Sequence, residues 1–355
     1  MKNKIPFLIM MLILSSLPVI SQKSSEPRDE FTLLTMPYNR RPLSLYKGQL
    51  EVNAGYKFAV RSRTYDSNGD LILLKDEGTA SVYHYYLLEL KYGITDFLEL
   101  TAETYYSKHG IRSVTTEYYS LSDNITVNTL STIKGMGDLL LYGTLRLPID
   151  FKWVDFGIRG GMYLPTADNK TSQPTNTVTN ITAANTFTVN YQFNEKNGYG
   201  VPVYLLSSDL KFTFSKISLE TDFTFKDPVK EGQNIRWDQS LTANKTFTYS
   251  NNSYQYLLSR SFEINAALHF QATGWFNIKL SSDYMKSSGG WTEYYGSKYK
   301  NPETNLFVLE PGCEIQVSPA LTIYEVTGFP LAGKNMDGPF YLFITASINM
   351  FPFFK

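Results

Sequence analysis

Residues 79–106 carry an alternation of apolar and polar side chains that few folds can accommodate. Val82, Leu88 and Leu90 lie on one side of the pattern, and Ser81 and Glu89 lie on the other. A period of two places each set on its own face of a strand. The alternation resumes after a tight turn at 93–96, so the pattern predicts an antiparallel hairpin. Its strands are longer than a typical strand of a soluble protein, which has about five or six residues. Their length is enough to cross a bilayer, which takes about nine to eleven residues of a tilted strand.

The first 21 residues have the pattern of a secretory signal peptide. Lys2 and Lys4 form a positive region, residues 5–14 are apolar, and small residues precede the expected cleavage site. The apolar core is too short for a transmembrane helix. We therefore expect an exported protein whose residues 22–47 form a periplasmic N-terminal segment ahead of a barrel at 48–355.

Composition excludes several classes of protein. The sequence has 33 basic and 33 acidic residues, so it lacks the basic surplus that a nucleic-acid partner requires. Cys313 is the single cysteine, which excludes an internal disulfide. After the leader, no apolar run reaches the about 18 residues of a membrane-spanning helix. Aromatic residues make up 15%, with 26 Tyr and 23 Phe, as expected for interface girdles of a membrane barrel.

The same alternation recurs along the chain and predicts twelve strands. They are expected at 49–61, 79–92, 98–106, 138–147, 153–164, 199–214, 217–226, 261–272, 275–285, 306–317, 321–331 and 340–351. Five short turns alternate with six longer connections, which is the arrangement of a bacterial barrel with both ends on one side. The fold class is therefore an all-β, transmembrane, antiparallel up-and-down β-barrel of about twelve strands. Long extracellular loops are expected at 107–135, 165–198 and 227–259.

One further segment, 237–249, also alternates. As a thirteenth spanning strand it would break the even strand count, so we place it in an external loop as part of a protruding hairpin. The alternative is a fourteen-strand barrel in which 187–193 supplies the other extra strand.

Charged residues occupy many inward positions of the predicted strands. Isolated charges are costly in a packed core but compatible with a water-filled lumen. The lumen-lining candidates are Glu51, Lys57, Arg61, Glu99, Glu103, Asp138, Arg146, Arg159, Asp209, Lys211, Glu220 and Asp222. Both signs are interspersed, so the alternative is that these charges pair across strands and merely fill the lumen. In a barrel of twelve strands the pore should be set by side chains and by any loop or N-terminal segment that folds inward.

Catalysis is not indicated. A barrel hydrolase would need a His–Ser couple oriented by a third polar group. His84 falls on the lipid-facing register, His109 falls in a predicted loop, and His269 faces the lumen without a serine two positions away on its face. No His/Cys cluster has the spacing of metal ligands. We predict no enzyme activity, no metal and no cofactor.

Four short motifs in order carry a family resemblance. They are Arg41-Pro42 followed by Gly48-Gln49-Leu50-Glu51, the turn Y-G-I-T-D-F-L-E-L, Gly135-Met136-Gly137-Asp138-Leu139, and Tyr163-Leu164-Pro165-Thr166. From about Arg41 onward the chain resembles the outer-membrane family associated with meta-pathway phenol degradation, which is related in architecture to the long-chain fatty-acid transporters. The resemblance implies a porin-like barrel that passes small molecules, hydrophobic or aromatic ones included.

Together these features predict a channel in the outer membrane of a Gram-negative bacterium that passes small solutes passively. The expected partners are outer-membrane lipids, an unidentified small solute, and the barrel-assembly machinery during biogenesis, with no nucleic acid. A surface-exposed structural or interaction barrel without transport activity is the alternative, favoured by the long loops.

Overall fold

Twelve antiparallel strands close into a β-barrel, as the alternation predicts. The computed structural model describes residues 41–74, 81–120, 123–147, 153–167, 175–180, 198–241, 247–294 and 296–351. The barrel strands are β1 (Leu50–Arg61), β4 (Ser81–Gly93), β5 (Leu98–Ser120), β7 (Leu139–Leu147), β8 (Val154–Leu164), β10 (Val203–Phe214), β11 (Ile217–Pro228), β14 (Ser261–Gln271), β15 (Phe276–Ser287), β18 (Thr304–Gln316), β19 (Leu321–Lys334) and β21 (Phe340–Met350). The first and last strands pair over their length, from Leu50 opposite Met350 to Val60 opposite Phe340, which closes the sheet.

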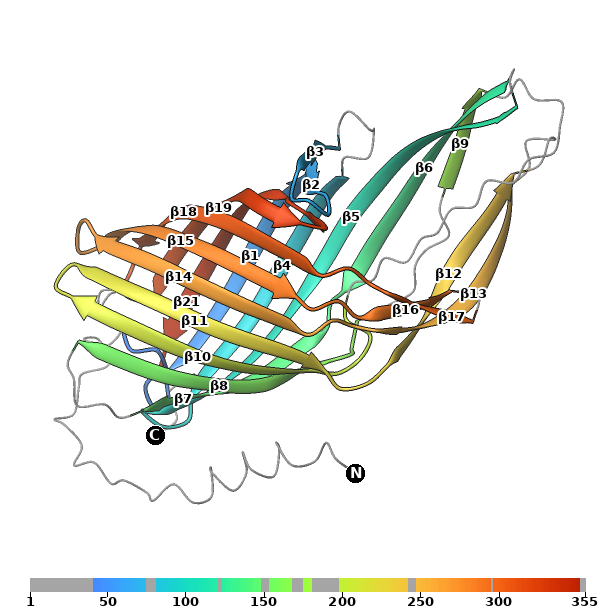
Figure 1. Cartoon of the computed structure of the whole chain (residues 1–355). Coiled ribbons are helices and arrows are strands. Elements are labelled where there is room, and N and C mark those ends of the chain that lie inside the picture. The colour runs from blue at the N-terminus through green and yellow to red at the C-terminus, as the bar shows by residue number, and fades with distance from the viewer. Residues whose placement is uncertain are drawn as a thin grey trace. The chain divides into compact units, whose positions relative to one another are not determined.

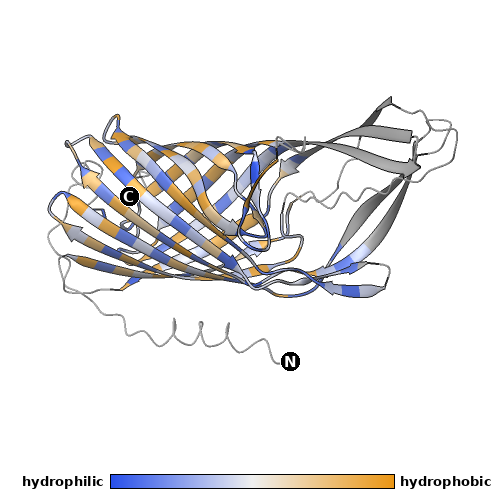
Figure 2. Cartoon of the chain, turned by 45° about the horizontal axis from the view of Figure 1, so that its top comes forward, coloured by the Kyte–Doolittle hydropathy of each residue, from blue (hydrophilic) through white to orange (hydrophobic). Residues whose placement is uncertain are grey.

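The two faces of the sheet differ as a membrane barrel requires. Leu88 and Leu141 are 46% and 42% exposed, whereas Asn53 and Asp209 are 6% and 4% exposed. Figure 2 shows the alternation of hydrophilic and hydrophobic residues along the barrel strands. The apolar set therefore points outward and the polar set points into the barrel.

Connection lengths divide the barrel into two ends. The described short connections 94–97, 215–216, 272–275 and 317–320 lie at one end, which we call the turn end. In the two-residue turn at 215–216, Ser215 has a φ of 52°, as primed hairpin turns require. The longer connections lie at the opposite end, the loop end (Figure 1). Within the described ranges, no helix is long and apolar enough to cross a membrane.

The polar loop expected at 107–135 is instead a continuation of two strands, so that part of the prediction was wrong. β5 runs on to Ser120 and pairs with β6 (Asp123–Met136) beyond the barrel, and β9 (Thr175–Asn180) adds to this extension (Figure 1). Outside a membrane, neither face of a hairpin must be apolar, so the hydropathy alternation disappears. The β-branched residues of this stretch still favour strands.

The segment 237–249 belongs to a protruding hairpin, as predicted. β12 (Gly232–Leu241) pairs with β13 (Phe247–Leu257) in a separate sheet that includes β16 (Trp291–Tyr294) and β17 (Ser297–Lys300). The fourteen-strand alternative is wrong, because the barrel closes with twelve strands. Its other extra segment, 187–193, lies outside the described residues. A third small sheet joins β2 (Arg63–Tyr65), β3 (Leu71–Leu73) and β20 (Met336–Asp337) at the loop end.

Candidate functional site

A short segment enters the barrel at the turn end and is held there by carboxylates. We call residues 41–47 the strap. Three of its alternate backbone N–H groups each donate to a different carboxylate: Leu43 to Asp155 at 2.9 Å, Leu45 to Glu99 at 2.8 Å, and Lys47 to Asp96 at 3.1 Å. Hydrogen bonds to charged acceptors are stronger than neutral ones. The inward carboxylates of β5 and β8 therefore fix the path of the strap.

The strap side chains reach the barrel interior. A methyl group added to Gly157, an inward position of β8, would lie 3.7 Å from Leu43 Cδ1. At Gly93 an added methyl group would lie only 2.0 Å from the carbonyl oxygen of Tyr46. Glycine at position 93 is thus what allows the strap backbone to pass directly against β4.

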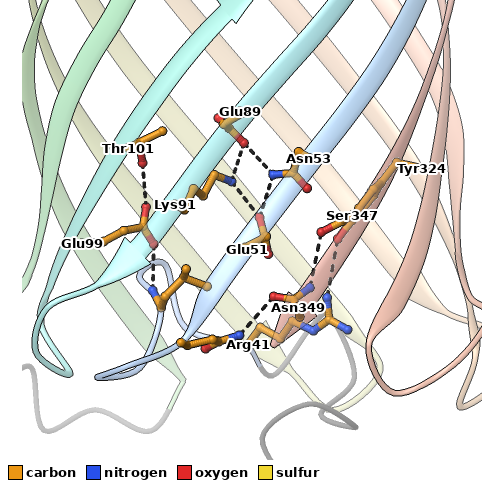
Figure 3. Close-up of polar contacts among 12 residues, drawn as sticks. Arg41, Glu51, Asn53, Glu89, Lys91, Glu99, Thr101, Tyr324, Ser347 and Asn349 are labelled. Atoms are coloured by element: carbon orange, nitrogen blue, oxygen red, sulfur yellow. Dashed lines mark hydrogen bonds and ion pairs between the residues drawn. The ribbon is translucent and has the colours of Figure 1, made fainter. Parts of the chain in front are cut away.

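Arg41 ties the strap to another part of the barrel wall. Its Nη1 lies 3.9 Å from Glu314 Oε1 on β18 and donates to the Tyr324 hydroxyl on β19 at 3.5 Å. Asp155 and Glu99 lie on β8 and β5, so the strap connects strands that are far apart around the barrel. Figure 3 shows Arg41 near the turn end, below the polar clusters of β1 and β4. The strap therefore narrows the turn end of the lumen.

Above the strap, β1 and β4 contribute a compact cluster. Lys91 Nζ lies 3.1 Å from Glu51 Oε1 and 3.0 Å from Glu89 Oε1. Asn53 Nδ2 donates to the same two carboxylates, at 2.8 Å and 2.6 Å (Figure 3). The cross-strand register places Glu51 opposite Lys91 and Asn53 opposite Glu89, so the alternation of two strands builds the cluster directly.

A second cluster joins β8, β10 and β11. Arg159 Nη2 lies 2.5 Å from Asp209 Oδ1 and 3.0 Å from Asp222 Oδ2. The hydroxyls of Ser207 and Thr224 donate to Asp222 at 3.0 Å and 2.7 Å. Each carboxylate thus has several partners, which offsets the cost of placing two acidic groups together.

The remaining predicted residues are spread along the lumen and do not form one ring. Arg146 pairs with Asp155 at 2.6 Å, and Lys211 pairs with Glu220 at 2.6 Å. Near the loop end, Arg61 pairs with Asp337 at 2.9 Å.

Asp138 has a role that its place in the strand pattern did not suggest. Its carboxylate is buried and accepts hydrogen bonds from the backbone N–H of Ala167 at 3.1 Å and of Tyr199 at 2.6 Å. Both donors flank the connection between β8 and β10. Asp138 therefore anchors the two ends of this connection to the barrel rim.

Sequence reasoning missed several residues of the site. Glu89, Lys91 and Asp155 lie in segments whose alternation predicts strands, so the sequence predicts that their side chains face inward. It does not predict their partners on other strands. An N-terminal segment that folds inward was expected as one way to set the pore, but the docked path of 41–47 was not predicted, because three of its contacts are made by backbone N–H groups that no side-chain motif marks.

Carboxylates outnumber cationic groups at the inward positions of the described barrel. The carboxylates are those of Glu51, Glu89, Glu99, Glu103, Asp138, Asp155, Asp209, Glu220, Asp222, Glu263, Asp283, Glu310 and Glu314. The cations are those of Lys57, Arg61, Lys91, Arg146, Arg159, Lys211, Lys226 and Lys279. The interior field therefore favours positive over negative mobile ions.

A cavity of about 410 Å³ lies toward the loop end of the barrel. Its lining includes tyrosine rings from β4 and β5 and charged groups from β1 and β5, namely Tyr83, Tyr85, Tyr105, Lys57, Arg61 and Glu103. We call it the loop-end cavity. It gives the lumen a chamber of ligand size above the charged clusters.

Similar solved structures are outer-membrane barrels. An outer-membrane channel from Pseudomonas putida F1 aligns with a TM-score of 0.59 and 12% identity, covering 86% of this chain and 97% of that one. The likeness is one of fold. A deletion mutant of the TodX monoaromatic hydrocarbon channel aligns at 8% identity over 87% of this chain and 91% of that one, with a TM-score of 0.49. No protein-family model and no characterised protein sequence matches this chain. Membership in the phenol-degradation family therefore stays a prediction.

Proposed function

We propose that the protein is a bacterial outer-membrane channel through which small solutes diffuse passively. The observation that carries this proposal is the closed barrel whose outward face is apolar and whose interior holds charged clusters and a ligand-sized cavity. A barrel built only as a rigid anchor has no need of so many inward ionisable groups, each of which requires partners or water. The fold shared with an outer-membrane channel supports the proposal.

We place the turn end in the periplasm and the loop end outside the cell. Residues 1–21 would direct export, and 22–47 would form the periplasmic N-terminal segment, whose last residues, 41–47, are the strap that enters the barrel. Outer-membrane barrels have short periplasmic turns and longer extracellular loops, and this pattern supports the orientation. Outer-membrane lipids would contact the apolar face, and the assembly machinery would insert the chain.

The lumen-lining candidates contribute in different ways under this proposal. A twelve-strand barrel is wider than eight-strand barrels, whose side chains fill the interior, and narrower than sixteen-strand porins. The clusters around Lys91 and Arg159 would set the polarity of the path, and the strap would set its narrowest section. No energy-coupling motif is present in the sequence, so the solute would move down its own gradient.

Electrical recording of the purified protein in planar bilayers tests the proposal. We expect discrete current steps in potassium chloride and a reversal potential of the sign that marks cation selectivity, because inward carboxylates are in excess. Liposome swelling with neutral and charged aromatic solutes then ranks the solutes. Wild-type protein that inserts yet gives neither current nor swelling would refute the channel.

A surface-interaction barrel is the second candidate. It is favoured by the strands that continue beyond the barrel at the loop end, in the β5–β6 and β12–β13 hairpins. Deletion of 237–249 distinguishes the two candidates. A protein that acts only as a channel should keep its conductance after this deletion.

A further inference from the structure

The loop-end cavity has the composition of a site for a specific class of solute. Tyr83 and Tyr85 present parallel rings, with an interplanar angle of 3° and centroids 6.2 Å apart. The Tyr105 ring stands at 66° to that of Tyr85, with centroids 5.9 Å apart. Three tyrosines on two adjacent strands thus line one wall of a cavity of about 410 Å³. Such faces carry negative electrostatic potential and attract cations.

Glu103 supplies a carboxyl group without a protein partner among the described residues at this wall. Within the part of the chain that the structure describes, its carboxylate makes no hydrogen bond and no ion pair. The lumen cations Lys91 on β4 and Lys226 on β11 are already paired, Lys91 with Glu89 at 3.0 Å and Lys226 with Glu263 at 2.8 Å. Arg159 is likewise shared between two aspartates. A mobile cation is therefore the partner that this carboxylate lacks.

The cationic residues of the cavity are themselves compensated. Arg61 is paired with Asp337 at 2.9 Å. Lys57 Nζ lies 3.7 Å from the centroid of the Tyr341 ring, whose hydroxyl donates to Glu310. An ammonium group of the protein thus already rests on a tyrosine ring of this lumen. That contact, on the adjacent strands β1 and β21, shows the kind of interaction that a solute ammonium would make with the tyrosine rings of β4 and β5.

We propose that the loop-end cavity binds small organic cations with an apolar body, such as aromatic amines or quaternary ammonium ions. The cation lies on the rings of Tyr83, Tyr85 and Tyr105, and Glu103 is its counter-ion. This inference rests on the proposed channel, because the cavity would be the chamber through which the solute passes.

Titration calorimetry on the detergent-solubilised full chain tests the site. The probe is benzyltrimethylammonium, compared with benzyl alcohol as a neutral analogue and benzoate as an anion. We expect the cation to bind most tightly. Glu103→Gln should weaken its binding roughly tenfold while leaving benzyl alcohol unchanged, and Tyr85→Leu should weaken the cation by a similar factor. Benzoate binding as tightly as the cation would overturn the proposal.

Glu220→Gln is the matched control, because this inward carboxylate does not line the cavity and pairs with Lys211, which does not line the cavity either. It should change the affinity for the probe by less than about twofold. Equal losses of affinity in Glu220→Gln and Glu103→Gln would mean that only the general charge of the lumen matters, and would overturn the site. Heat-modifiable migration on a gel verifies that each variant is folded. If Glu103→Gln migrates abnormally, Glu103→Asp replaces it; this variant keeps the carboxyl group and should retain part of the affinity for the probe.

Failure of this inference is distinguishable from failure of the channel. In planar bilayers the probe, added on the loop side, should reduce the potassium current of wild type more than that of Glu103→Gln. Normal current without block or calorimetric binding would reject the site and leave the channel standing. Calorimetric binding without any current would reject the channel and leave the site.

Discussion

Release of the strap is the perturbation whose size follows most directly from the structure. Glu99→Ala removes the carboxylate that accepts the Leu45 N–H at 2.8 Å. A hydrogen bond to a charged group contributes about 1.5–3 kcal/mol. If this bond exists only while the strap is docked, its loss raises the undocked fraction by about ten- to a hundredfold. The bonds from Leu43 and Lys47 remain, so the barrel itself should stay folded.

Amide hydrogen exchange measures this change. The exchange rate at Leu45 should rise by about ten- to a hundredfold in Glu99→Ala, since exchange follows the population of the open state. Trypsin should also cleave after Lys47 more readily than in wild type. Glu263→Ala is the control, because it removes an inward carboxylate that pairs with Lys226. Unchanged exchange at Leu45, or an equal rise in the control, would refute the assigned role of Glu99.

Three other changes test separate parts of the account. Leu141→Arg, on the outward face of β7, should lower the free energy of unfolding by about 2–4 kcal/mol if it lies at the bilayer midplane, whereas the inward change Thr144→Arg should lower it less. Urea titrations of the protein in lipid vesicles measure both values, and equal losses would mean that the two faces are assigned wrongly. Arg146→Ala combined with Arg159→Ala should shift the reversal potential further toward cation selectivity, because Asp155, Asp209 and Asp222 lose their arginine partners. An unchanged reversal potential would mean that these arginines are purely structural. Gly93→Ala should displace the strap, since the added methyl group would meet the Tyr46 carbonyl oxygen at 2.0 Å, and wild-type protection of the strap amides in this variant would contradict the docked path.

The barrel could be predicted from sequence because its constraint is local. Every spanning strand must place apolar residues toward lipid at each second position, so stretches such as the one around Leu88 and Leu90 identify both the strand and its outward face. An even number of strands then follows from the alternation of short and long connections. The choice between twelve and fourteen strands needed the structure. Beyond the membrane that constraint ends, and the continuation of β5 to Ser120 carries no hydropathy alternation.

The site was predictable only in part, because strand alternation gives direction and not partners. Glu51 and Arg159 were expected to face inward, but their pairing with Lys91 and Asp209 depends on the register between strands. Asp138 lies at an inward position and yet holds the backbone of the β8–β10 connection. The strap depends on N–H groups of residues such as Leu43, which any residue except proline could supply.

Single-channel recording of wild type alongside the double variant Glu99→Ala plus Asp155→Ala tests whether the barrel is a channel that the strap narrows. We expect discrete, cation-selective current steps in wild type and larger steps in the double variant, whose strap has lost two of its carboxylate acceptors. Glu263→Ala should keep the step size close to wild type. Absence of current in wild type, with the protein inserted and folded, would contradict the channel and favour the surface-interaction barrel.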